Sequence, residues 1–153
     1  MRNVEKLKGA KWLDWVKGLA RQRPLTVASL APVPIEMTKG EALVGITYVK
    51  YVLQHKGPIE YAATEKYLTD ANYLSIGAKA RHLSAARLYV DFASSAEGQE
   101  FLARTGDFVL YPGIHPPVRD ADKVVANMLI MDAPTEQEMK KLREDFREIF
   151  LAK

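Results

Sequence analysis

The chain has 153 residues, of which 48% are hydrophobic and 27% charged, a composition typical of a folded globular protein and not of a disordered or collagen-like chain. Its 22 basic and 19 acidic residues give a formal net charge of +3. The basic residues form no tract, so no nucleic-acid partner is expected. The absence of cysteine excludes disulfides and thiolate chemistry.

The first part of the chain is predicted to alternate helices with short strands. Apolar residues at intervals of three to five positions predict an amphipathic helix from Val4 to about Gln22, which ends because Pro24 cannot continue it. A short helix ending near Lys39 and another over residues 48–56 are also expected. The apolar runs at 25–29, 42–48 and 59–63 are predicted to be strands, the second of them buried.

The second part of the chain carries clearer helix signals. Residues 73–77 are expected to be extended, followed by a helix from Ser84, as N-cap, to Ser94. A further helix over 96–104 is predicted to end in a glycine cap at Gly106, before a short strand at 107–111. The proline-rich residues 112–118 predict an irregular connection, and Thr135 with Glu138 predicts a capping box ahead of the last helix. This alternation indicates the α/β class.

Few residues in the sequence point to a chemical reaction. The three histidines are well separated and lack metal-binding spacing, so no metal site is expected. Motifs for nucleotide binding and for a serine nucleophile are also missing from the sequence. We therefore expect no cofactor and no catalytic residue.

Tyrosines crowd residues 48–73, and Tyr48 and Tyr51 lie where a predicted strand meets a predicted helix. Helix N-termini at strand ends are common sites for small anions in α/β proteins. Side chains that only pack against neighbours would give the same pattern, so both interpretations stay open at this point.

Four segments match a known family in their order and spacing: TKGEALVGITY at 38–48, GAKARH at 77–82, AARLYVDF at 85–92 and SAEGQEFL at 95–102. Together they resemble the C-terminal half of the extracellular solute-binding proteins of ABC importers, with the ferric-iron type as the most similar subgroup. The resemblance extends over nearly the whole chain.

The resemblance implies a periplasmic-binding-protein-like fold of type II, in which two α/β lobes close over a ligand. Only part of that fold would be present: most of the second lobe in residues 1–68, a segment returning to the first lobe through a hinge in 69–117, and a tail on the second lobe in 118–153. One copy would then not form a complete cleft. The helix Ser84–Ser94 would expose an apolar face, which a second copy, as in a domain-swapped dimer, or a complementing N-terminal half would cover.

The resemblance also implies candidate ligand-binding residues, namely Thr47, Tyr48, Lys50 and Tyr51. Ferric-binding members carry adjacent tyrosines where this chain has Lys50 and Tyr51. Phenolate oxygens suit ferric iron, and a lysine puts a positive charge where the cation would bind. Iron is therefore disfavoured, and a small anionic or carboxylate-bearing ligand is favoured, with Lys50 as its ion-pair partner and Thr47 and Tyr48 as donors. A Lys50 side chain that points into solvent would fit the sequence equally well.

By this resemblance the chain is expected to be the C-terminal part of a non-enzymatic binding protein that captures a small solute between two lobes for import, and a single copy is not expected to be competent for binding. Its partner would be a membrane ABC permease, and its location would be periplasmic or extracellular, although no signal peptide is visible in the chain. The alternative is a truncated, oligomeric structural or interaction protein that has lost solute binding.

Overall fold

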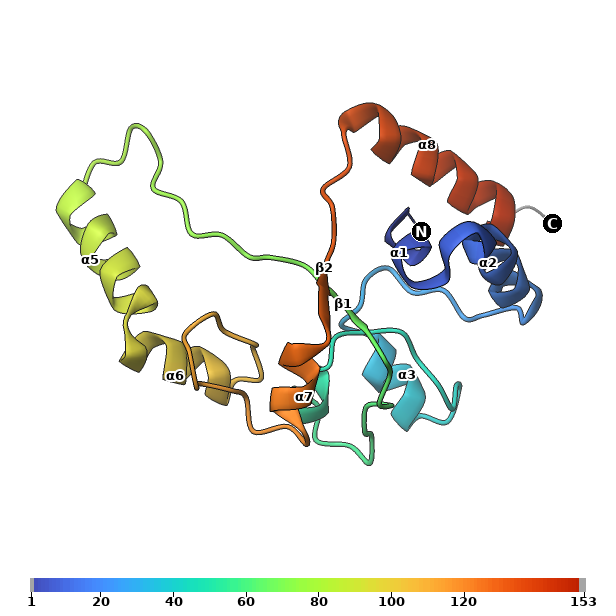
Figure 1. Ribbon diagram of the computed structural model, residues 1–153, viewed down its shortest axis with the longest axis horizontal. Coiled ribbons are helices and arrows are strands. Elements are labelled where there is room, and N and C mark those ends of the chain that lie inside the picture. The colour runs from blue at the N-terminus through green and yellow to red at the C-terminus, as the bar shows by residue number, and fades with distance from the viewer. Residues whose placement is uncertain (1, 152–153) are drawn as a thin grey trace. The chain divides into compact units, whose positions relative to one another are not determined.

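The computed structural model describes residues 2–151, and the chain divides into two compact units (Figure 1). Unit 1 comprises Met1–Thr26, Lys66–Ala71 and Met128–Lys153, and unit 2 comprises Val27–Glu65 and Asn72–Asn127. The chain therefore passes between the units after residues 26, 65, 71 and 127. These boundaries differ from the predicted lobe boundaries at 68/69 and 117/118, and the assignment of lobes stays a prediction.

Unit 1 begins where an N-terminal helix was predicted, and the structure has several consecutive short helical segments there. They are η1 (Arg2–Val4), α1 (Glu5–Lys8), η2 (Gly9–Lys11) and α2 (Trp12–Arg21). The predicted continuous helix is wrong at Gly9, whose φ of 54° is outside the helical region. Val16 on α2 is buried, and the helix ends ahead of Pro24 as predicted.

The last helix of unit 1 confirms the predicted capping box. In α8 (Glu136–Phe146) the Thr135 hydroxyl accepts a hydrogen bond from the backbone N–H of Glu138 at 3.3 Å. The Glu138 carboxylate accepts in return from the backbone N–H of Thr135 at 2.9 Å. A π-helical segment, η3 (Arg147–Leu151), continues directly from α8.

The sheet of unit 1 consists of two parallel strands, β1 (Tyr67–Thr69) and β2 (Met128–Ile130), in the described part of the chain. Leu68 pairs with Leu129, and the N–H of Met131 extends the ladder by donating to the carbonyl of Thr69 at 2.8 Å. Lys6 ties the N-terminal helices to this sheet by donating to the carbonyl of Ile130 at 3.0 Å. Neither strand was predicted, because both runs are short and β1 lies in a polar interval.

Unit 2 is built from short helices joined by irregular segments. They are α3 (Val33–Thr38), α4 (Tyr51–Gln54), α5 (Leu83–Ser94), α6 (Ala96–Arg104) and α7 (Ala121–Ala126). The prediction of α6 is confirmed, as is its glycine cap, since Gly106 has a φ of 100°. Residues 112–118 contain no helix or strand, also as predicted. The sequence did not predict α7, and it gave α4 too many residues.

The N-cap of α5 corrects a further prediction. Ser84 lies inside the helix, which begins at Leu83 after His82, and no side chain caps this end. A helix can begin without a capping side chain when water or other groups satisfy its first N–H groups.

The runs predicted as strands at 25–29, 42–48, 59–63, 73–77 and 107–111 form no strand. The run at 42–48 is also not buried, because Leu43 is 94% exposed and Val44 is 83% exposed. A strand is stable only when its backbone groups pair with a neighbour. Within residues 2–151 no segment pairs with these runs.

The mixture of helices with a parallel strand pair agrees with the predicted α/β class. Among residues 2–151, none of the helices has both the length and the apolar composition needed to cross a bilayer.

Candidate functional site

The predicted ligand-binding residues lie in unit 2, around α4 and the turn after α6. Lys50, the N-cap residue of α4, places its ammonium nitrogen 3.0 Å from the Asp107 carboxylate. Gln54, at the other end of α4, donates to the carbonyl of Thr105 at 2.7 Å. Two polar contacts thus hold this short helix against residues 105–107.

Gly106 allows this close approach. Its positive φ favours glycine, and a Cβ built there would lie 3.0 Å from both Cβ and the carbonyl oxygen of Lys50. The absence of a side chain at this position therefore lets the backbone of the turn reach the start of α4.

Two tyrosines complete the cluster. The rings of Tyr48 and Tyr51 have centroids 6.0 Å apart and planes tilted by 47°. The Lys50 ammonium lies 5.8 Å from the centroid of the Tyr48 ring, at the range of a cation–π contact. The structure thus brings Tyr48, Lys50 and Tyr51 together, and Lys50 has a partner within the chain.

Thr47 is close in sequence but its hydroxyl is engaged elsewhere. It donates to the carbonyl of Leu30 at 2.7 Å. A hydroxyl has one proton and two lone pairs, so Thr47 can still accept a hydrogen bond while this bond is intact.

Asp107 is a member of the cluster that the sequence did not predict. It is separated from Lys50 by 57 positions, and the sequence analysis predicted it only as the start of a short strand. No spacing motif relates the two residues. Their side chains are about one-third exposed, at 29% for Lys50 and 34% for Asp107, so water and small solutes can reach the pair.

Acidic and imidazole side chains do not gather into metal-binding groups in the structure described. Among residues 2–151 there is no group of three such side chains placed to hold a metal ion.

Comparison with known proteins gives the class of protein. A family model described as bacterial extracellular solute-binding protein matches residues 3–106, more than half of the chain. The chain therefore belongs to the family of bacterial extracellular solute-binding proteins. No curated protein and no solved structure matches the chain.

Membership of this family supports the coarser expectations drawn from the sequence. In general it implies a small-molecule ligand, a role in transport with a membrane transporter as partner, and a periplasmic or extracellular location. The matched residues include Thr47, Tyr48, Lys50 and Tyr51, and Asp107 directly follows their end.

Proposed function

We propose that this protein captures a small anionic or carboxylate-bearing solute for import through an ABC permease, and that the solute contacts Tyr48, Lys50 and Tyr51. The family match supports solute capture. The main support for the site is the partly exposed Lys50 side chain, whose ammonium lies 3.0 Å from the Asp107 carboxylate and 5.8 Å from the centroid of the Tyr48 ring. A solute carboxylate would compete with Asp107 for this cation.

Ferric iron fits this cluster less well than an organic anion. The Lys50 ammonium lies over the Tyr48 ring, and its charge would repel a trivalent cation bound beside the tyrosines. The tyrosine hydroxyls would instead donate hydrogen bonds to the solute.

We propose in addition that residues 1–153 correspond to the C-terminal half of a type II binding protein of the ferric-iron-type subgroup. The lobes would be residues 1–68 with 118–153, and residues 69–117 would return to the other lobe through a hinge. In support, the chain leaves unit 1 after residue 71, two residues beyond the end of β1 and close to the proposed boundary at 68/69. Closure about that hinge would trap the solute.

Calorimetric titration of the purified chain with acetate, succinate, citrate and phosphate tests the proposed site. Lys50→Ala should weaken binding of the tightest of these anions about tenfold, the effect of losing one charge-assisted hydrogen bond. Asp107→Asn should strengthen it, because the competing carboxylate is gone. Lys56→Ala removes an exposed cation of the same segment and should change the affinity less than twofold.

Equal effects of Lys50→Ala and Lys56→Ala would contradict the site, since only the net charge would then matter. Weaker anion binding by Asp107→Asn would also contradict it. Absence of binding for all four anions would count against this ligand class while leaving the family assignment intact.

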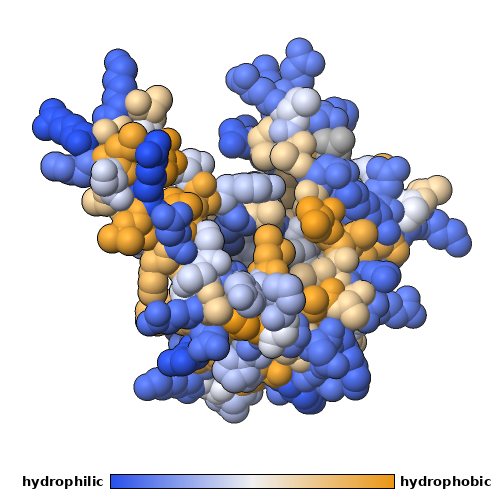
Figure 2. Space-filling model, turned by 60° about the vertical axis from the view of Figure 1, so that its left-hand side comes forward, coloured by the Kyte–Doolittle hydropathy of each residue, from blue (hydrophilic) through white to orange (hydrophobic). Residues whose placement is uncertain are grey.

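A second candidate function rests on the exposed face of α5. Leu88 is 69% exposed, Tyr89 is 62% exposed and Phe92 is 45% exposed, and their positions along α5 put the three apolar side chains on one face of the helix. Figure 2 shows hydrophobic side chains gathered at the surface of the left-hand part of the molecule. A wide apolar face on a helix is normally covered by another part of a protein. The protein would then act as an oligomer, or as the partner of a complementing N-terminal half, without binding a solute itself.

Light scattering after size exclusion tests this second candidate. A stable dimer that dissociates in Leu88→Gln but persists in Leu43→Gln, a leucine outside α5 that is 94% exposed, would support it. A monomer that binds an anion through Lys50 would contradict it.

A further inference from the structure

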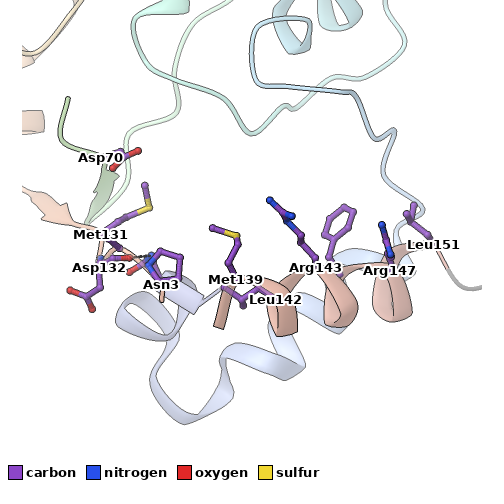
Figure 3. A pocket seen from close by; sticks show the side chains of 12 residues that line it. Asn3, Asp70, Met131, Asp132, Met139, Leu142, Arg143, Arg147 and Leu151 are labelled. Atoms are coloured by element: carbon purple, nitrogen blue, oxygen red, sulfur yellow. Dashed lines mark hydrogen bonds between the residues drawn. The ribbon is translucent and has the colours of Figure 1, made fainter. Parts of the chain in front are cut away.

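A groove in unit 1 carries chemistry that the Lys50 cluster does not use. Its volume is about 730 Å³, within the range of small-molecule sites (Figure 3). Its walls are α8, η3, the segment after β2, Asp70 at the end of β1, and Asn3. Every one of these residues belongs to unit 1, so the groove depends on that unit alone.

The floor of the groove is apolar. It is formed by Met131, Met139, Leu142, Phe146 and Leu151. The Phe146 ring is stacked on Phe150, with centroids 4.9 Å apart, which fixes its orientation. Met139 and Leu151 are nevertheless exposed, so a bound apolar group would remove their surface from water.

Two arginines stand on the same wall. Arg143 lies on α8 and Arg147 lies on η3, four positions later, and both side chains point to the same side in Figure 3. Neither forms an ion pair with another residue within 2–151, whereas Lys141 on the same helix pairs with Asp145 at 2.9 Å. Two guanidinium groups, one turn apart, are therefore available to an external anion.

The acidic residues of the groove lie at its other end. Asp70 and Asp132 are grouped away from the two arginines in Figure 3. Lys6 forms an ion pair with Asp132 at 2.9 Å, which offsets one of these negative charges. The groove thus has a positive end, an apolar middle and a weakly negative far end, and an anionic head is favoured only at the arginine end.

We infer that this groove binds an amphipathic organic anion, with its carboxylate or phosphate head on Arg143 and Arg147. The planar guanidinium forks suit such heads through paired N–H···O hydrogen bonds. The apolar body of the ligand lies over Met139, Leu142 and Phe146. This site is separate from the proposed solute site, which belongs to unit 2.

Titration of the full chain with sodium octanoate, below its micelle-forming concentration, tests the assignment. The double variant Arg143→Gln/Arg147→Gln should bind octanoate at least tenfold more weakly. The matched control Lys140→Gln/Lys141→Gln removes the same charge from the same helix, outside the groove, and should change the affinity less than twofold. Lys50→Ala should leave octanoate binding unchanged.

Further probes separate the head from the body of the ligand. Octyltrimethylammonium and acetate should each bind at least tenfold more weakly than octanoate, because each lacks one half of the required chemistry. Octyl phosphate should bind at least as well as octanoate. Circular dichroism checks that the double variant is folded. If the double variant does not fold, Arg147→Gln alone takes its place, and it should bind octanoate several-fold more weakly than the unchanged chain.

Three outcomes would overturn the inference. They are no binding of octanoate in the millimolar range, equal binding of octanoate and octyltrimethylammonium, and equal weakening in the groove variant and its matched control.

Discussion

Asp120 and Lys123 form an exposed ion pair at the start of α7, with 2.9 Å between Nζ and Oδ1. The hydrogen bond from Lys123, and then its positive charge, hold the pKa of Asp120 below its ordinary value. The same contact raises the pKa of Lys123. Since the Asp120 pKa is lowered by folding, its contribution to stability is present above the unfolded-state pKa and is lost as the pH falls through the folded-state pKa.

The substitution Lys123→Ala should therefore raise the pKa of Asp120 toward the ordinary aspartate value of about 3.9. An NMR titration of the Asp120 carboxyl carbon measures this change. Lys140→Ala, which removes a cation far along the sequence, should leave the midpoint where it is. An unchanged midpoint in Lys123→Ala would show that the ion pair is not populated in solution.

Gly106 and Gly113 both have positive φ angles, but only Gly106 is crowded. Alanine at either position should cost about 1–2 kcal/mol of stability through backbone strain. Gly106→Ala should cost about 1 kcal/mol more and should also weaken solute binding, because the added methyl would lie 3.0 Å from Lys50. Thermal unfolding and anion titration measure both effects. Equal losses in the two variants would contradict the close approach at Lys50.

The corner between α5 and α6 is held by hydrogen bonds of the Ser95 and Gln99 side chains. The Ser95 hydroxyl accepts from the N–H of Gly98 at 3.2 Å and caps α6. Gln99 donates to the carbonyl of Ala93 at 2.6 Å across the corner. A Cβ on Gly98 would collide with the carbonyl oxygen of Phe92 and lie 2.9 Å from the Cα of Ala93.

Two helical glycines are therefore expected to respond to alanine with opposite signs. Gly98→Ala should destabilise by about 1–3 kcal/mol, because backbone atoms must move. Gly18→Ala, on α2 with no atom near its Cβ position, should stabilise by about 0.4–1 kcal/mol. Urea unfolding of both variants measures the difference, and destabilisation by Gly18→Ala would contradict the open surroundings of that residue.

The helices could be predicted better than the strands because their signals are local. Thr135, Glu138 and Gly106 act on residues a few positions away, so α6 and the start of α8 could be predicted from the sequence. Strands depend on pairing with distant segments, and apolar runs such as 42–48 have no partner within the described residues. In β1 and β2, pairing outweighs the weak local signal.

In the candidate site, too, contacts between residues close in sequence could be predicted and contacts between distant residues could not. Tyr48, Lys50 and Tyr51 could be predicted to lie together because they share one turn of chain. The position of Asp107 beside Lys50 could not be predicted from the sequence, because it depends on how the turn after α6 packs on α4. The two interpretations of Lys50 drawn from the sequence, a partner for a solute anion and a side chain in solvent, therefore did not include the ion pair with Asp107 that the structure has.

On the scale of the whole molecule, the strand pair joins two of the three segments of unit 1, residues 66–71 and 128–153. Met131→Pro removes the donor that bonds Thr69, and should destabilise unit 1 by about 1 kcal/mol or more. Leu110→Pro, at a position 97% exposed in unit 2, should have a smaller effect. Hydrogen exchange should show faster exchange in β1 for Met131→Pro only. Equal exchange in both variants would contradict a structural role for the ladder.

The parallel pairing of β1 with β2 also sets an order on biosynthesis. The ribosome makes β1 first, and residues 70–127 must all be added before Met128 can pair with Tyr67. Helices α5 and α6 are adjacent in sequence, so they can contact each other as soon as residue 104 has been added. During that interval the edge of β1 has no strand beside it, so the backbone groups of residues 67–69 are open to pairing with other segments until β2 has been made.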